Sequence, residues 1–168
     1  GMVRAAYSCG KPALGVGAGN VPAFIERTAK LQRAVNDVVL SKAFDNGMIC
    51  ASEQAVILDE PIYDAAMAEF ARLHAHRATP AEKQLLEEFL FGVAAGARNC
   101  GEAKLNAAVV GQSPVWIAEQ AGFAVPDDTS IILAEVGGVG PSEPLTREKL
   151  APVLAVLHPA RRPAASSA

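Results

Sequence analysis

Short apolar runs that alternate with amphipathic stretches constrain this chain most strongly. A buried strand needs only about four to eight apolar residues, whereas an amphipathic helix repeats its apolar residues at a spacing of three to four. Strands alternating with helices predict an α/β layer with a largely parallel sheet, in which an edge strand can run antiparallel. The expected strands are residues 13–16, 21–25, 55–58, 106–110, 130–136 and 152–157.

Four helices are expected between these runs, and residues typical of helix starts or ends indicate each of them. Thr28 can cap the first helix, which should end near 44–47, where Asn and Gly interrupt the pattern. Pro61 follows an acidic pair at the start of the second. Residues 79–82 read Thr-Pro-Ala-Glu, a capping box for the third. Residues 113–122 begin with Ser-Pro and end with Gly, the pattern of a short fourth helix.

Length and composition indicate one globular domain. The chain has 168 residues, 51% of them hydrophobic and 20% charged, which excludes a wholly disordered or collagen-like chain. The net charge is −3 and Lys and Arg do not cluster, so nucleic acid is not expected as a partner. No apolar run reaches the ~18 residues of a membrane span, and no secretory signal begins the chain, so we expect a cytoplasmic protein without a membrane segment.

Three cysteines, Cys9, Cys50 and Cys100, form an odd set without a CxxC pair. This spacing argues against a disulfide framework and against a tetrahedral zinc site, so no metal is expected. A reactive thiol is one interpretation. The other is that each cysteine is a small buried apolar residue, the commoner case for a free thiol.

Glycines at positions 15, 17 and 19 follow an apolar run and invite comparison with a dinucleotide-binding loop. The third glycine is not at the position of that fingerprint, and a strand-like segment containing Pro22 follows instead of a helix. A tight turn with close backbone packing is therefore the better interpretation of the glycines alone.

A more specific pattern is Phe-Asp-Asn-Gly-Met-Ile-Cys-Ala-Ser-Glu-Gln at residues 44–54, which contains Cys50. With residues 5–22, 105–112, 121–126 and 148–154, it closely resembles the catalytic domain of CoA-acylating aldehyde dehydrogenases. The likeness is greatest to the acetaldehyde dehydrogenase half of bifunctional aldehyde-alcohol dehydrogenases. It implies an α/β fold with a layered sheet flanked by helices, incomplete relative to the full family fold.

The resemblance implies a role for the thiol. Cys50 matches the family's nucleophile, whose thiolate attacks an aldehyde; the adduct loses hydride to NAD, and coenzyme A then releases the acyl group as acyl-CoA. The Cys50 backbone N–H is a candidate oxyanion donor. Gly15 stands where hydrolytic relatives have a Glu that activates water, and because glycine cannot act as a base, acyl transfer to CoA is favoured over hydrolysis.

Three further positions match cofactor contacts of the family. Glu148 matches a Glu that holds the nicotinamide ribose, and Leu150 stands where an aromatic residue often lies beside the cofactor. Gly17 matches a backbone contact to the cofactor. Without the family, Glu148 reads as a solvated charge between Arg147 and Lys149, because exposed carboxylates are common. Cys9, Cys100 and the three histidines match no functional position.

The resemblance also implies that a full family member has a nucleotide-binding domain ahead of this region and an oligomerising strand after it. We therefore expect residues 1–157 to form a catalytic-domain portion and residues 158–168, rich in Pro, Ala and Ser, to be a disordered tail. The implied substrate is acetaldehyde, and the full-length protein is expected to be a homo-oligomer. Two alternatives remain: a non-catalytic fragment acting as an interaction module, and a cysteine hydrolase that uses Cys50.

Overall fold

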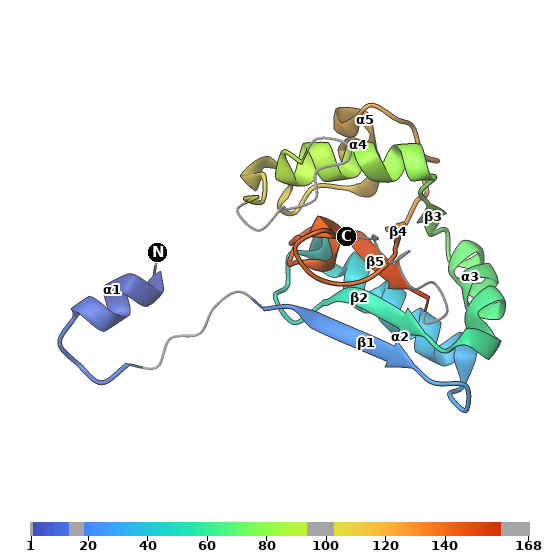
Figure 1. Cartoon of the computed structure of the whole chain (residues 1–168), viewed down its shortest axis with the longest axis horizontal. Coiled ribbons are helices and arrows are strands. Elements are labelled where there is room, and N and C mark those ends of the chain that lie inside the picture. The colour runs from blue at the N-terminus through green and yellow to red at the C-terminus, as the bar shows by residue number, and fades with distance from the viewer. Residues whose placement is uncertain (1, 14–18, 94–102, 159–168) are drawn as a thin grey trace, which may run out of the picture.

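A parallel sheet organises the computed structural model, which describes residues 2–13, 19–93 and 103–158. All pairings between its five strands are parallel, and the strand order is β1-β2-β5-β4-β3 (Figure 1). The strands are β1 (Val21–Ile25), β2 (Glu53–Leu58), β3 (His76–Arg77), β4 (Ile132–Val136) and β5 (Val153–Leu157). The expected α/β class and parallel sheet are thus confirmed, and no antiparallel edge occurs among the described strands.

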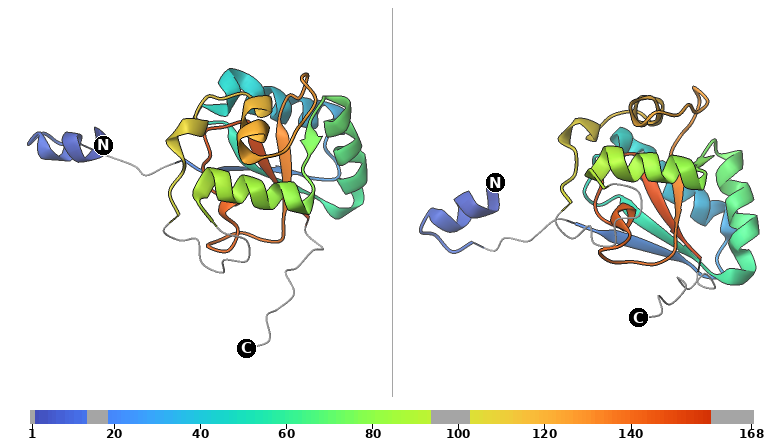
Figure 2. Two further views of the ribbon diagram at one scale, coloured as in Figure 1. Left: turned by 90° about the horizontal axis from the view of Figure 1, so that it is seen from above. Right: turned by 45° about the horizontal axis from the view of Figure 1, so that its top comes forward.

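Helices cover both faces of the sheet. On one face, α2 (Leu31–Ala43) and α3 (Tyr63–Arg72) bury Val35 and Phe70 against Val56 and Val156. On the other, α4 (Pro80–Phe91) and α5 (Pro114–Ala121) form a second apolar cluster with β4 and β5 (Figure 2). The side chains of successive strand residues point to opposite faces, so each central strand contributes to both clusters.

Local capping explains where several of these helices begin and end. The Thr79 hydroxyl accepts a hydrogen bond from the Glu82 N–H, and the Glu82 carboxylate accepts one from the Thr79 N–H, so the expected capping box is confirmed. Ser113 caps α5, and Gly122 ends it in the left-handed conformation, as expected. The expected cap at Thr28 is wrong: its hydroxyl bonds to Glu26 instead, and α2 begins at Leu31 without a side-chain cap.

The expected strand at 106–110 is also wrong. Residues Ala107–Val109 form a 3-10 helix, because the Asn106 side-chain oxygen accepts from the Ala108 N–H and its amide donates to the Phe89 carbonyl. Asn favours such local hydrogen bonds over a strand ladder. Three further 3-10 helices are Phe44–Gly47, Glu60–Ile62 and Pro144–Thr146.

Two elements were not expected from the sequence. The two-residue β3 lies at one edge of the sheet, and α1 (Met2–Ser8) lies apart from the layers (Figure 1). Ala13 is irregular, whereas the rest of the strand expected at 13–16 lies outside the described residues. So do Gly15, Gly17, Cys100 and, except for His158, the expected tail. None of the described helices is long and apolar enough to cross a membrane.

Candidate active site

The candidate site lies at the edge of the sheet where the parallel strands begin. Gly19 precedes β1, Cys50 precedes β2, and Glu148 precedes β5. A Cβ atom added at Gly19 would be 3.1 Å from the Cys50 carbonyl oxygen and 3.6 Å from Glu148 Oε1. The fold therefore brings the backbone of the predicted nucleophile and the predicted cofactor carboxylate, 98 positions apart in the sequence, next to the same glycine.

A left-handed turn fixes the segment that leads to Cys50. Asp45, Asn46 and Gly47 all have positive φ, at 49°, 49° and 69°. The Asn46 amide donates to the Gly111 carbonyl over 2.9 Å. A Cβ at Gly47 would lie 2.5 Å from the Ala151 carbonyl oxygen, closer than any side chain tolerates. Glycine is thus required at position 47 both for its conformation and for the close approach of two backbones.

Cys50 itself is exposed. The Ser52 N–H donates to the Ile49 carbonyl over 3.0 Å, so the cysteine lies in a tight turn just before β2. Side chains of Met48 and Ile49 beside it are 43% and 40% exposed. The turn therefore presents Cys50 at the surface of the described part of the chain.

A buried polar cluster lies behind this turn. The Gln54 Oε1 accepts from Lys42 Nζ over 3.2 Å and from the Lys149 backbone N–H over 3.1 Å, while its Nε2 donates to the Ser52 carbonyl over 3.3 Å. Lys42, Gln54 and Lys149 are fully buried. Because buried polar groups are costly unless they are bonded, these contacts must form together.

Burial shifts the titration of both lysines. Loss of hydration lowers the pKa of Lys42 to about 8, although the carboxylates of Glu53 and Glu148 oppose this effect. Burial also lowers the pKa of Lys149 well below its usual value, and the charge of Lys42 adds to that decrease. The Lys149 Nζ donates to the carbonyl oxygens of Gln54, Leu145 and Arg147 at 2.8, 2.6 and 3.0 Å, which uses all three donors of an ammonium group.

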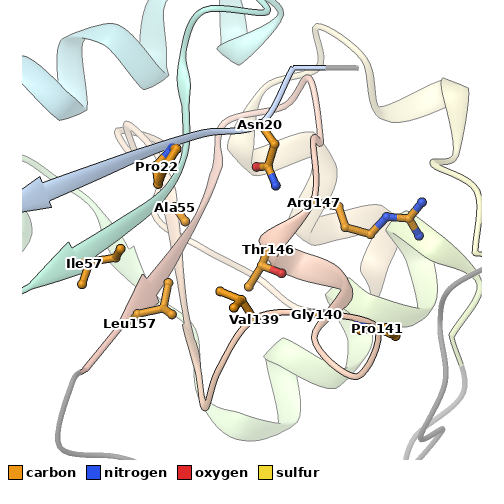
Figure 3. A pocket seen from close by; sticks show the side chains of 10 residues that line it. All are labelled: Asn20, Pro22, Ala55, Ile57, Val139, Gly140, Pro141, Thr146, Arg147 and Leu157. Carbon is orange, nitrogen blue, oxygen red and sulfur yellow. The ribbon is translucent and has the colours of Figure 1, made fainter. Parts of the chain in front are cut away.

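Two cavities share a wall beside Glu148. The first, about 380 Å³, is lined by Glu148, Gly19, Lys104 and Arg147, among others. The second, about 420 Å³, lies mainly between apolar side chains of the sheet and the loop that contains Val139 (Figure 3). Asn20 and Arg147 line both cavities. The Arg147 guanidinium is held by the Ala103 carbonyl over 2.7 Å.

Leu150 is the predicted cofactor contact with the most unusual backbone. Its φ is 48°, a left-handed conformation that is strained for leucine. Its carbonyl accepts from the Gly111 N–H over 3.2 Å, and its side chain is half-buried. The structure places it directly after the Glu148–Lys149 pair but not in the lining of either cavity. The fourth predicted site residue, Gly17, lies outside the described residues.

Sequence reasoning missed the buried lysines and Gln54. The signal was present: Gln54 interrupts an apolar strand, and Lys42 falls within the amphipathic helix before Cys50. Polar residues at apolar positions are the informative exceptions to burial rules. Lys149 lies between two of the predicted site residues, but the sequence assigns it no role of its own.

Cys9, His74 and His76 have local partners. Cys9 is exposed and directly follows α1, and its Sγ lies 2.9 Å from the carbonyl oxygen of Ala6 in that helix. His74 pairs with Asp128 at 2.7 Å, and His76 with Glu82 at 3.2 Å. Within residues 2–13, 19–93 and 103–158, no group of His, Cys, Asp or Glu is arranged to hold a metal ion.

Comparisons with known proteins find relatives in sequence and in structure. No protein-family model matches the chain. The aldehyde-alcohol dehydrogenase of Streptococcus pneumoniae serotype 4 is 63% identical over 156 residues, which are 93% of this chain and 18% of that protein. The solved acetylating aldehyde dehydrogenase of Geobacillus thermoglucosidasius is 42% identical, with a TM-score of 0.82, over 94% of this chain and 33% of its own.

A second solved structure is informative about chemistry. It is a propionaldehyde dehydrogenase from Rhodopseudomonas palustris with bound CoA and an acylated cysteine, 31% identical with a TM-score of 0.77, over 94% of this chain and 34% of that one. The fold is that of a segment of the solved acylating aldehyde dehydrogenases. More particularly, the chain matches the acetaldehyde dehydrogenase part of the bifunctional aldehyde-alcohol dehydrogenases, and it spans only about a fifth of the length of those curated relatives.

The Gly47 contact gives a first prediction. Gly47→Ala should lower the free energy of unfolding by roughly 3 kcal/mol, because overpacking against the Ala151 backbone adds to the strain of a left-handed alanine. Gly92→Ala is the matched control: its φ is 65°, but nothing lies within 4 Å of the new Cβ. It should cost only about 1 kcal/mol. Urea unfolding of both variants measures the difference, and equal losses would contradict a close contact at Gly47.

The Lys42 environment gives a second prediction. Between pH 8 and 10.5 the folded chain has released the Lys42 proton while the unfolded chain still holds it. The unfolded state then binds more protons, so the free energy of unfolding rises with pH, by roughly 2.5 kcal/mol across this window after other groups are subtracted. Lys42→Met lacks this contribution. Urea titrations at several pH values compare the two proteins, and parallel curves would exclude the depressed pKa.

Proposed function

We propose that this chain is the cysteine-bearing catalytic portion of an acylating acetaldehyde dehydrogenase. The reaction oxidises acetaldehyde with NAD and CoA to acetyl-CoA and NADH through a thioester on Cys50. The observation that supports this most is the exposed Cys50 in a fixed turn, whose backbone carbonyl lies beside Gly19 together with the Glu148 carboxylate. The acylated cysteine in the propionaldehyde dehydrogenase of R. palustris supports the same chemistry. In this proposal residues 1–157 form the catalytic portion.

The first step belongs to Cys50. Its thiolate attacks the aldehyde carbonyl carbon, and the carbonyl oxygen becomes an oxyanion in a thiohemiacetal. Among the described residues, no hydrogen bond uses the Cys50 N–H, which leaves this donor available to the oxyanion. The turn from Asp45 to Gly47 contributes by holding the cysteine backbone in one place, because orientation of the reacting groups lowers the barrier.

The residues beside Cys50 fit a dinucleotide. No hydrogen bond or ion pair from a described residue occupies the Glu148 carboxylate, which can therefore accept from ribose hydroxyls. We propose Glu148, Gly17 and Leu150 as the contacts of this chain with NAD. The absence of a side chain at Gly19 keeps the space between Glu148 and Cys50 open. When bound, NAD would serve as the hydride acceptor of the oxidation.

Acyl transfer to CoA completes the proposal. The CoA thiolate attacks the acyl carbon, the bond to the Cys50 sulfur breaks, and acetyl-CoA leaves while the enzyme thiolate is restored. Lys104 and Arg147 line the cavity next to Glu148, and their charges suit the phosphates of CoA or of the dinucleotide. Gly15 offers no carboxylate to activate water, which favours thiol attack over hydrolysis.

The setting of the enzyme is part of the same proposal. A cysteine nucleophile persists as a thiol in a reducing compartment, so we place the protein in the cytoplasm. Following the family resemblance, the full-length protein is proposed to be a homo-oligomer. Curated relatives are named as dehydrogenases, so a non-catalytic interaction module is not favoured.

Acyl transfer in reverse gives the third prediction. Incubation with acetyl-CoA should place one acetyl group on Cys50, since the thiolate can attack the thioester of acetyl-CoA and release CoA without any hydride transfer. Intact-mass and peptide mass spectrometry should find a mass increase of one acetyl group per chain, lost in Cys50→Ala and kept in Cys9→Ser. Equal labelling of Cys9 would indicate nonspecific acylation. A folded chain that stays unlabelled would contradict the proposed function.

A further inference from the structure

Lys149 lies between two residues of the proposed cofactor site, yet its own side chain points away from solvent. It is fully buried, and its Nζ donates to three carbonyl oxygens, those of Gln54, Leu145 and Arg147. Two of these carbonyls belong to the segment that carries Glu148, and the third belongs to β2. One ammonium group thus bonds the Glu148 segment to the strand that follows Cys50.

A second link runs through the Gln54 side chain. Its Oε1 accepts from the Lys149 backbone N–H, and its Nε2 donates to the carbonyl of Ser52, two residues after Cys50. Lys42 Nζ donates to the same Oε1 from α2. The peptide between Glu148 and Leu150 is therefore bonded through both its backbone and its side chain to the turn that presents the thiol.

The backbone next to Lys149 shows why such bonds are needed. Leu150 has a φ of 48°, which leucine adopts only when its surroundings impose it. The Gly111 N–H bonds its carbonyl on one side, and the Lys149 contacts hold the chain on the other. Without the ammonium, three carbonyl oxygens would lose a donor, and the contacts to two of them are buried, so the strained segment could relax.

We propose that Lys149 is a positioning residue that holds the Glu148 segment at a fixed separation from Cys50, and so shapes the wall of the cavity that receives the acyl donor. This inference rests on the proposed function, because it assigns a role to Lys149 within the same site. Lys149 touches neither substrate nor cofactor. It acts through the carbonyls it bonds, and through Glu148 and Arg147 on either side.

The test separates binding from the intrinsic reactivity of the thiol. Acylation of Cys50 is followed at increasing acetyl-CoA concentration in the wild-type chain, in Lys149→Met and in Lys30→Met, an exposed lysine at the start of α2 that serves as the matched control. We expect Lys149→Met to raise the half-saturating acetyl-CoA concentration at least about fivefold, since a loosened wall weakens binding. Alkylation of Cys50 by iodoacetamide, which needs no such wall, should stay within about twofold of the wild type.

A second variant keeps the proposal testable if Lys149→Met does not fold. Gln54→Met has a similar volume and leaves the Lys149 ammonium in place while removing the side-chain link. Gln54→Met should also raise the half-saturating acetyl-CoA concentration, but by a smaller factor than Lys149→Met. Amide hydrogen exchange should increase in residues 145–150 in both variants, while the protection of α4 and α5 stays as in the wild type.

The outcomes are distinguishable. If the wild-type chain reacts with iodoacetamide but never with acetyl-CoA, the proposed function fails and the role of Lys149 fails with it. If the wild type is acylated and Lys149→Met saturates at the same concentration as Lys30→Met, only the positioning role is overturned. If acylation, alkylation and exchange protection are lost together across the chain, Lys149 is merely structural and the proposal is also overturned.

Discussion

The close contact between the backbones of Gly47 and Ala151 is the constraint on which the candidate site depends. It joins the end of the α2 connection to the start of β5, two segments that lie far apart in the sequence. Because no side chain fits between them, the Cys50 turn and the Glu148 segment approach each other as closely as a glycine permits. The Asn46 bond to Gly111 and the Gly111 bond to Leu150 connect the same two segments a second time.

This close approach requires strained backbone conformations, and the buried lysines help to explain how those conformations persist. Three left-handed residues precede Cys50, and a strained leucine follows Lys149. Strain of this kind persists only where surrounding contacts impose it. Lys42, Gln54 and Lys149 supply those contacts, although burying two ammonium groups is itself unfavourable. The polar cluster therefore fixes the geometry of these segments more than it stabilises the fold. Apolar residues of similar size would pack behind the turn at a lower electrostatic cost.

Sequence reasoning anticipated the fold from patterns that act locally. The strands at 21–25, 55–58, 130–136 and 152–157 and the capped helices came from apolar spacing and from start and stop residues. It failed where a single polar side chain overrode the pattern, as Asn106 did when it turned an apolar run into a 3-10 helix. It also failed at β3, because a two-residue strand is defined by its neighbour β4 and not by its own residues.

The candidate site shows the same division between local and tertiary information. The motif around Cys50 and the Glu148 motif could be read from the sequence, but their proximity across Gly19 depends on the order in which strands join the sheet. Lys149 could not be assigned to the core, because it looks like a solvated charge until β2 and the Leu145 turn enclose it. Lysine is so often exposed that only the tertiary fold reveals the exception.

The edge of the sheet at which the site lies decides which charges it can use. Open parallel sheets usually bind ligands where their strands end, since the helices that follow begin there and direct their N-terminal N–H groups at the ligand. Cys50 lies where the strands begin, an edge built from connections that enter β1, β2 and β5. The N-termini of α2, α3 and α4 follow strand ends and so lie toward the opposite edge. Fixed charge at the site must therefore come from side chains, which is why Glu148, Arg147 and the two buried lysines lie at or behind this edge.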